Sequence, residues 1–404
     1  MAAIVRSHLD EPLLIVVSAM GKTTNALEKL IPGFSANLEE DFNTLKQYHL
    51  DIAHGLFRDE SHPIFGRLDQ LFGQLHSRIS EQPEDYNYDY DQVVSFGELI
   101  STTIVAEYLA SIHLDSHWVD VRNVIRTDDN YREGHVDWDT TIKQAQQILS
   151  PMLQPHENNQ PIVVTQGFIA GTQSGATTTL GREGSDYSAS ILSFCLDATT
   201  MTIWKDVPGF LNADPKYFRN TIKISEIPFN EAIELAYYGA SVIHPKTVKP
   251  IQNKGISLNI KSFINPLAEG SVIGPFKTIS PQTPLYIFKN HQTLISILPK
   301  DFSFIAEDNL QTIFANLAKL NIRANLMQNS ALSFSLCIDH NDILLQKLQD
   351  ELGEAFLLRY NEDLQLITIR YYTQQIIDQI VDGRPIILQQ RSRTTTQLLV
   401  ENRK

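Results

Sequence analysis

The segment from Thr177 to Ser188 gathers the side chains best suited to bind a small charged molecule. Three threonines lead into Gly-Arg-Glu-Gly-Ser-Asp at residues 181–186, which predicts a hydroxyl-rich turn followed by a helix of small residues. The glycines permit positive φ and a close approach of the backbone to a ligand. Ser185 or Asp186 would cap the helix, and the planar guanidinium of Arg182 suits a carboxylate or a phosphate. A plain capping turn is the alternative, but the density of such residues favours a binding site.

A second candidate loop follows the apolar run Leu13 to Val17, which predicts a strand buried on both faces. Residues 18–25 contain a Gly-Lys pair that begins at Gly21, but a Walker-type phosphate loop needs another glycine five positions earlier, where this chain has valine. A loop between a strand and a helix still points N–H groups at anions. Ser18 and Thr24 would add hydroxyl donors, and an ordinary turn is the alternative.

The loop after the predicted strand Thr202 to Trp204 has the composition of a nucleotide site. It carries aromatic, acidic and basic side chains on a rigid Pro/Gly frame through residues 205–216. Ligands of open α/β sheets bind at the carboxyl ends of strands. Adenine would need an apolar slot there, and phosphates would need a lysine.

Two further side chains have both a structural and a chemical interpretation. Glu98 lies in the first turn of a predicted helix from Val94 to Leu109, where the helix dipole favours an acid, but it would also pair with a substrate ammonium group. His244 precedes a proline at the end of an element, and we interpret it as a packed turn residue rather than a general base.

Strands and helices alternate over most of the chain, which predicts an α/β fold: a mainly parallel sheet with helices on both faces. Residues 34–92 lack strand patterns, which predicts a helical insertion. We expect its stretch Glu81 to Asp91 to be a solvated, acidic lead-in, that is, a segment that precedes the next helix. From Pro284 two shorter strand-helix-strand passes predict ferredoxin-like modules, the second abbreviated. We therefore expect domains at 1–280 and 285–404, divided within residues 275–290.

The composition narrows the classes of partner. The chain has 404 residues and a formal net charge of −14, which argues against a nucleic-acid partner. Cys195 and Cys337 each lie in an apolar run, so we expect two buried thiols in a reducing cytoplasm. We find no apolar stretch near the ~18 residues that span a bilayer and no signal peptide.

Together these segments resemble the aspartate kinases of the amino acid kinase family. The matching segments, in the family's order over about residues 10–270, are residues 16–20 with 24–25, 96–98, 181–186, 204–209 with 213–215, and 239–245. The C-terminal pair resembles the family's ACT modules. The resemblance implies transfer of the γ-phosphate of ATP to the side-chain carboxylate of L-aspartate, with Mg²⁺ on the phosphates. This reaction is the first step of lysine, threonine and methionine biosynthesis.

The resemblance also implies residue roles. Arg182 would bind a carboxylate of aspartate, Glu98 its ammonium group, and Asp186 would organise the donors around the transferring phosphoryl group. Arg182 and Asp186 are thus the implied catalytic residues, and no protein metal ligand is implied. The other implied substrate-binding residues are Ser18, Thr24 and Ser185, and the implied nucleotide-binding residues are Gly21, Lys205, Asp206, Phe210, Asp214 and Lys216. A homodimer through the ACT modules is expected.

Three features depart from the family pattern. The family opens with a strand ending in Lys-Phe-Gly-Gly, which nothing here matches, so we expect a start further upstream or an impaired enzyme that serves as a regulatory or ligand-binding subunit. Ser241 stands where many members have lysine. Residues 325–331 lack the acidic residue and the Thr-Ser-Glu pattern of lysine-inhibited members, so lysine feedback is not expected.

Overall fold

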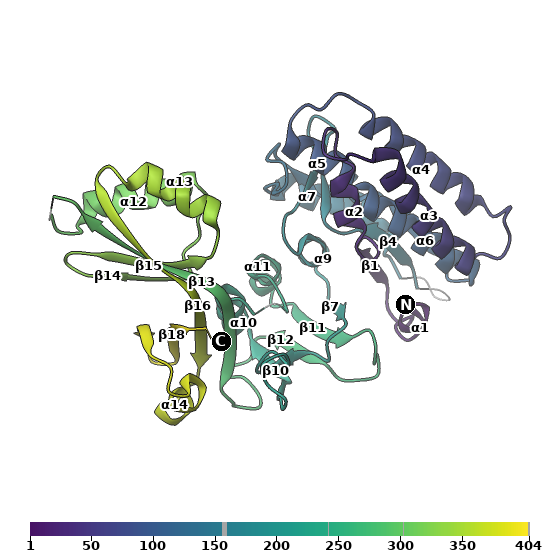
Figure 1. Ribbon diagram of the computed structural model, residues 1–404. Helices are drawn as coiled ribbons and strands as arrows, with labels where there is room; N and C mark the ends of the chain where they lie inside the picture. The colour runs from purple at the N-terminus through teal and green to yellow at the C-terminus, as the bar shows by residue number, and fades with distance from the viewer. Residues whose placement is uncertain (156–159, 241, 302, 403–404) are drawn as a thin grey trace. The chain divides into compact units, whose positions relative to one another are not determined.

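The computed structural model describes all residues except 156–159, 241, 302 and 403–404. Its contacts divide the chain into two compact units, which are described separately (Figure 1). Unit 1 comprises Met1–Gly209, Ser225–Ile233 and Val242–Lys277, and unit 2 comprises Phe210–Ile224, Glu234–Ser241 and Thr278–Lys404. The chain therefore crosses between the units several times, and the last crossing follows Lys277.

Unit 1 contains a parallel three-stranded sheet in the order β1-β4-β2. Its strands are β1 (Leu13–Val17), β4 (Ile162–Gln166) and β2 (Ser116–Val119). The central strand β4 is buried throughout, whereas β1 lies at the sheet edge and its side chains are only half-buried. The prediction that Leu13–Val17 is buried on both faces was thus too strong, because a strand at the sheet edge has a neighbouring strand on one side only.

A second, mixed sheet of unit 1 has the order β10-β12-β11-β7. Its strands are β10 (Glu226–Pro228), β12 (Ser271–Gly274), β11 (Ser257–Ser262) and β7 (Thr200–Lys205). Helix α9 (Gly184–Cys195) packs against both β1 and β7 and so links the two sheets.

A small sheet corrects one prediction directly. It joins β3 (Arg126–Thr127), β5 (Ile169–Thr172) and β6 (Thr177–Thr179). The three threonines predicted as a turn form β6, which is buried throughout. A polar strand can be buried because each hydroxyl has a partner: these partners are Arg122, Thr127 and Asp91.

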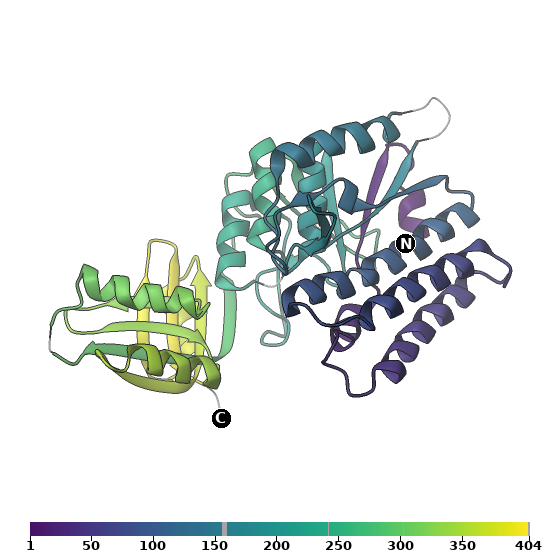
Figure 2. The ribbon, with the colours of Figure 1, turned by 90° about the horizontal axis from the view of Figure 1, so that it is seen from above.

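The helices of unit 1 surround these sheets (Figure 2). They are α1 (Ala2–Arg6), α2 (Thr23–Lys29), α3 (Leu38–Leu56), α4 (Pro63–Ile79), α5 (Tyr86–Val94), α6 (Phe96–Ser111), α7 (Trp138–Gln144), α8 (Ser150–Met152), α9 and α11 (Pro245–Lys254). Helix α10 (Phe229–Tyr238) begins in unit 1 and continues into unit 2. A π-helical turn covers Ala145–Leu149. Helices α3, α4 and α6 pack on one another, and their apolar faces form the largest core cluster of the unit.

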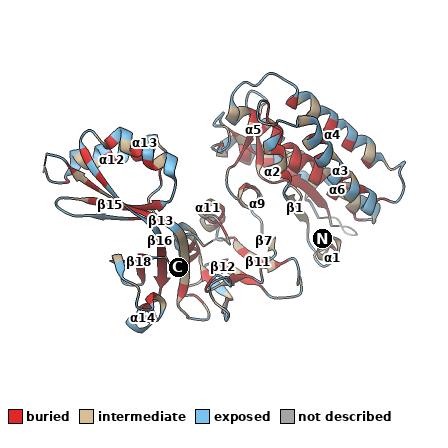
Figure 3. Ribbon diagram, in the orientation of Figure 1, coloured by how far each residue is buried: buried red, intermediate tan, exposed pale blue. Residues whose placement is uncertain are grey.

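The predicted acidic lead-in at Glu81–Asp91 is wrong for its second half. That half belongs to α5, which is coloured by burial in Figure 3. Asp89 and Asp91 of this helix are buried. Asp89 pairs with Arg78, and Asp91 binds three protein donors. Buried carboxylates need such partners, and the local sequence did not reveal them because the partners lie on other elements.

One stretch of the described residues, Tyr86–Ser111, is long and apolar enough to cross a membrane by composition alone. From the sequence we had predicted no apolar stretch of this length. It spans α5 and α6, and 78% of its window is buried inside the protein. Such burial is typical of a core helix.

Unit 2 is built on an antiparallel six-stranded sheet in the order β14-β15-β13-β16-β18-β17. Its elements are β14 (Leu326–Asn329), β15 (Phe334–Asp339), β13 (Leu285–Pro299), β16 (Phe356–Arg370), β18 (Thr395–Glu401) and β17 (Ile386–Arg391), with α12 (Glu307–Lys319), α13 (Asp342–Leu352) and α14 (Gln374–Val381), and the short pair β8 (Phe210–Leu211) and β9 (Lys223–Ile224). This is the predicted α+β type.

The two predicted modules share their central strands. Strands β13 and β16 have 15 residues each and pair with each other along their length, with register shifts near Gln292. Helices α12 and α13 cover one half of the sheet, and α14 covers the other. We had predicted shorter, separate strands, because the polar residues at the register shifts interrupt the apolar pattern.

Candidate active site

The loop between β1 and α2, Ser18–Lys22, packs on the first turn of α6. The N–H of Ala19 donates to Glu98 Oε1 at 3.1 Å, and the hydroxyl of Ser101 donates to the first carbonyl of the loop at 2.8 Å. A side chain at Gly97 would come within 2.9 Å of Ala19 Cβ. Only glycine therefore allows this approach, which explains the Phe-Gly-Glu pattern physically.

Glu98 is a buried carboxyl group with one unsatisfied oxygen. It is 2% exposed, and its Oε2 has no hydrogen-bond partner among the described residues. Burial raises its pKa to about 8, and the N–H of Ala19 offsets this only in part. A buried acid with one open oxygen is suited to pair with a cationic group of a ligand.

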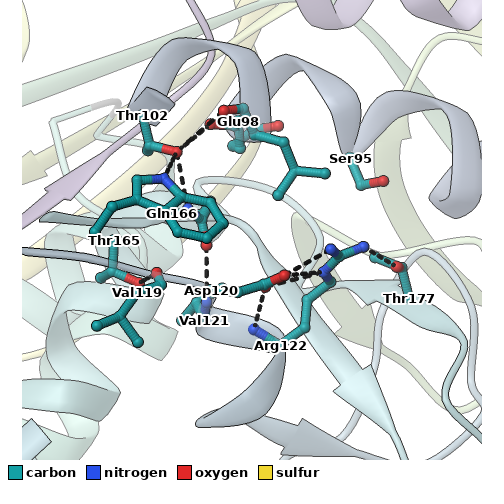
Figure 4. Close-up of polar contacts among 12 residues, drawn as sticks. Ser95, Glu98, Thr102, Val119, Asp120, Val121, Arg122, Thr165, Gln166 and Thr177 are labelled. Atoms are coloured by element: carbon teal, nitrogen blue, oxygen red, sulfur yellow. Dashed lines mark hydrogen bonds and ion pairs between the residues drawn. The ribbon is translucent and has the colours of Figure 1, made fainter. Parts of the chain in front are cut away.

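A hydrogen-bond network fixes the helix that carries Glu98 (Figure 4). The hydroxyl of Thr102 donates to the Glu98 carbonyl at 2.8 Å and accepts from Gln166 Nε2 at 2.8 Å and Trp118 Nε1 at 2.9 Å. Gln166 Oε1 accepts from the N–H of Val121 at 2.7 Å. The network ties α6 to the carboxyl ends of β2 and β4. Sequence reasoning missed it, although a glutamine that ends an apolar strand is a signal for such a role.

Arg122 was also missed, and the structure gives it a supporting role. Its guanidinium binds both oxygens of Asp120, at 2.6 to 3.1 Å, and donates to the Thr177 hydroxyl at 3.1 Å (Figure 4). These contacts engage the face of the guanidinium that a ligand carboxylate would otherwise occupy.

The start of α9 differs in detail from the prediction. The N-cap is Glu183, with φ +52°, and neither Ser185 nor Asp186 caps the helix, because both lie inside its first turn. A side chain at Gly167 would lie 2.5 Å from Ser185 Cβ. The start of α9 therefore packs against the carboxyl end of β4, the strand next to β1.

The structure brings two predicted site residues into direct contact. Lys205 Nζ lies 3.0 Å from Asp186 Oδ2 and donates to the carbonyl of Val242 at 2.7 Å. Burial raises the pKa of neighbouring Glu183, and the positive charge of Lys205 opposes this shift. Arg182 is exposed and forms no hydrogen bond or ion pair with the described residues, so its guanidinium is available to a ligand.

The remaining predicted nucleotide residues are spread over both units. Gly21 and Asp206 are exposed in unit 1, and Gly21 has φ +56°. In unit 2 the N–H of Lys216 donates to Asp214 at 2.8 Å within an exposed turn. Phe210 is 3% exposed and pairs with β9, so its ring packs inside unit 2. That these residues line one nucleotide site stays a prediction.

His244 is a turn residue, as we had interpreted it. It is the N-cap of α11, where Nδ1 accepts from the N–H of Lys246 at 3.2 Å. Its own N–H donates to the carboxylate of Glu183. Ser241, which stands at the family's lysine position, lies outside the described residues.

Comparison with known proteins supports the resemblance seen in the sequence. Residues 1–262 match the model of the Amino acid kinase family. The chain is 35% identical over 293 residues to the lysine-sensitive aspartokinase 3 of Escherichia coli K12, covering 69% of this chain and 62% of that relative. It is 31% identical over 381 residues to the chloroplastic aspartokinase 2 of Arabidopsis thaliana, covering 91% and 68%.

Among solved structures, E. coli aspartokinase III in complex with aspartate and ADP, in its R-state, matches with a TM-score of 0.84 and 28% sequence identity. The match covers 99% of this chain and 92% of that chain. The chain spans 62% to 66% of the length of three curated relatives that it matches.

Proposed function

Because the chain belongs to the amino acid kinase family and, within it, to the aspartokinases, we propose that it phosphorylates the side-chain carboxylate of L-aspartate with ATP. The products would be 4-phospho-L-aspartate and ADP. The observation that carries the proposal is the open, buried oxygen of Glu98 beside the loop at the carboxyl end of β1. An acid in this position suits the ammonium group of an amino acid.

The proposed aspartate site uses groups from three elements of unit 1. Glu98 of α6 binds the ammonium group, and Arg182 before α9 binds a carboxylate as a planar, bidentate donor. Ser18, Thr24 and Ser185 donate further hydrogen bonds. The packing of the Ser18–Lys22 loop on α6 and of α9 on β4 supports this arrangement.

The proposed transfer needs no general base. The aspartate side chain is ionised at neutral pH, so one of its oxygens attacks the γ-phosphorus in line. A new C(O)O–P bond forms, the bond between the γ-phosphorus and the bridging oxygen breaks, and ADP leaves with the electron pair. The protein's contribution is to align the reactants and to offset the charge on the phosphoryl oxygens.

Asp186 and Lys205 are placed to share that second task. Their ion pair sits where the first turn of α9 meets the end of β7. In the proposed complex Lys205 Nζ donates to a phosphate oxygen while its ion pair with Asp186 keeps it oriented. Gly21 and Asp206, the other predicted nucleotide residues of unit 1, complete the proposed nucleotide side.

The donor set fits a Mg²⁺ ion that arrives with the nucleotide. In the described part of the chain, no group of three His, Cys, Asp or Glu side chains gathers to hold a metal. Mg²⁺ usually takes one or two protein carboxylates and keeps phosphate and water ligands. Asp186 would hold it, directly or through water, and the ion would neutralise phosphate charge.

A hydroxamate assay tests the proposal, because hydroxylamine traps an acyl phosphate. Purified protein with ATP, Mg²⁺ and L-aspartate should form aspartyl hydroxamate, and glutamate or N-acetylglutamate should not replace aspartate. Omission of ATP is the control. Turnover with N-acetylglutamate alone would contradict the proposed substrate.

The alternative is a member of the family that binds ligands without transferring phosphate. Two measurements on the same protein distinguish an active kinase from this alternative. Calorimetry measures the binding of aspartate and ADP, and the hydroxamate assay measures turnover. Binding without turnover, both in this chain and in a version extended upstream with Lys-Phe-Gly-Gly, would support the alternative.

Assembly and compartment are further parts of the proposal. Unit 2 exposes large apolar side chains, among them Phe304, Leu332 and Ile343 at 56% to 69%. We propose a homodimer through this unit, in which such side chains would be covered. Light scattering should give twice the chain mass of 45.7 kDa. The two buried free thiols support a cytoplasmic location.

A further inference from the structure

Two consecutive residues of helix α3 contact the Ser18–Lys22 loop and the first residue of α2. The Tyr48 hydroxyl lies 2.8 Å from where a Cβ at Gly21 would stand. One residue later, His49 Nε2 lies 3.2 Å from the hydroxyl of Thr23, the first residue of α2. The helical insertion therefore contacts the loop of the proposed aspartate site, although we had predicted no role for it.

The contact at His49 is buried and specific. His49 is 0% exposed and Thr23 is 2% exposed. The other ring nitrogen of His49, Nδ1, lies 2.9 Å from the carbonyl of Leu45. A carbonyl only accepts, so Nδ1 carries a hydrogen. Burial lowers the pKa of His49, which favours the neutral ring and leaves Nε2 as an acceptor.

The Thr23 hydroxyl has two acceptors within reach. It lies 2.6 Å from the carbonyl of Met20 and 3.2 Å from His49 Nε2. The Met20 carbonyl also accepts from the N–H of Thr23 at 3.1 Å, so it stays satisfied when the hydroxyl turns to His49. Thr23 thus joins the turn of the loop to α3, and its Cγ2 lies 3.2 Å from a Cβ built on Gly97. The loop is held between α3 and the start of α6.

We propose that His49 is a positioning residue for the proposed reaction: acting through the Thr23 hydroxyl, it holds the Ser18–Lys22 loop in the conformation that binds the amino acid. This inference rests on the proposed function and assigns α3 a part in it. His49 does not touch the substrate. Its loss should weaken the binding of aspartate more than it slows phosphoryl transfer.

The test compares two shape-conserving variants. His49→Phe keeps a ring but removes both nitrogens, and Thr23→Val keeps the shape but removes the hydroxyl. Each should raise the KM for aspartate about five- to tenfold, the typical effect of one buried hydrogen bond, with kcat changed less than about twofold. The double variant should show less than the product of the two single effects, because both single variants break the contact between His49 and Thr23, although Thr23→Val also removes the hydrogen bond to Met20.

Two controls isolate the contact. Thr23→Ser keeps the hydroxyl and should restore the KM. His54→Phe makes the same exchange one turn further along α3, where the exposed ring stacks on Phe65, and should leave the KM unchanged. Melting temperatures measured in parallel identify loss of fold. Unchanged aspartate KM in folded His49→Phe and Thr23→Val proteins overturns the inference.

Hydrogen–deuterium exchange separates this inference from the proposed function. Peptides that cover the Ser18–Lys22 loop should exchange faster in His49→Phe and Thr23→Val than in the parent, His54→Phe and Thr23→Ser proteins. This readout needs no turnover. A parent protein silent in the hydroxamate assay contradicts the proposed function, whereas unchanged loop exchange contradicts the role of His49.

Discussion

Glu98 and Asp91 are both buried carboxylic acids, but their partners assign them different roles. Asp91 accepts from the N–H groups of Arg132 and Thr179 and from the Thr179 hydroxyl, at 2.7 to 2.9 Å. Glu98 accepts one N–H and keeps an open oxygen. The pKa of Asp91 is raised to about 6 by burial, against about 8 for Glu98. Asp91 is therefore structural, whereas Glu98 keeps one oxygen without a protein partner among the described residues.

The raised pKa of Glu98 makes aspartate binding pH-dependent. Below about pH 8 the free protein holds Glu98 protonated, but the ammonium group needs the ionised form, so binding must release a proton. Aspartate affinity should rise roughly tenfold per pH unit up to about pH 8 and then level off. Calorimetry in buffers of different ionisation enthalpy measures this release. In Glu98→Gln the release should vanish, and affinity without any pH dependence in the parent would refute the role.

Arg182 is tested by removal of its guanidinium. Arg182→Ala should weaken aspartate binding about ten- to hundredfold, because charge-assisted bonds are worth about 1.5–3 kcal/mol, while ADP affinity stays within about twofold. Arg393→Ala, another exposed arginine, controls for the change of net charge. Equal aspartate affinity in the two variants would remove Arg182 from the site.

At the scale of elements, β6 shows how a polar segment becomes part of a core. Its threonines read as a turn in the sequence, but Arg122, Thr127 and Asp91 supply partners from three other elements. Asp91 also joins α5 to the segment of Arg132. The strand therefore depends on side chains far away in the sequence.

The dependence of β6 on Asp91 is measurable as stability. Asp91→Asn brings an amide NH₂ toward donors and removes a charge that accepts three hydrogen bonds. The free energy of unfolding at pH 7.5 should fall by roughly 2–3 kcal/mol. Urea titration followed by circular dichroism checks this. Asp129→Asn, at an exposed site, should change it by less than about 0.5 kcal/mol, and equal effects of the two changes would contradict the assignment.

At the scale of the whole molecule, both units protect their single thiol. Cys195 of unit 1 and Cys337 of unit 2 are free and buried, as the sequence indicated. Burial raises the pKa of each to about 12. The thiolate is the reactive form, so neither thiol should react in the folded protein.

Ellman's reagent should therefore detect no fast-reacting thiol in the native protein and two after denaturation in guanidinium chloride. Cys195→Ser should leave one after denaturation. A rapid native reaction of either thiol would show that its unit opens, or packs more loosely, in solution.

The sequence by itself determined the alternation of strands and helices, the α+β character of the C-terminal part, and the loops and helix starts that carry Ser18, Glu98, Arg182 and Asp186. These follow from local patterns, because hydrophobic periodicity and turn residues act over short distances. The family followed from the same loops, since their order along the chain is specific.

Only the tertiary structure decided which of these groups meet. The contact of Ala19 with Glu98 joins residues 79 positions apart. The contact of Thr23 with His49 joins α2 to the helical insertion, for which we had predicted no role. The burial of Asp91, the pairing of Lys205 with Asp186 and the shared strands β13 and β16 are of the same kind. Burial, and with it the charge of an acid, depends on neighbours that only the folded chain brings together.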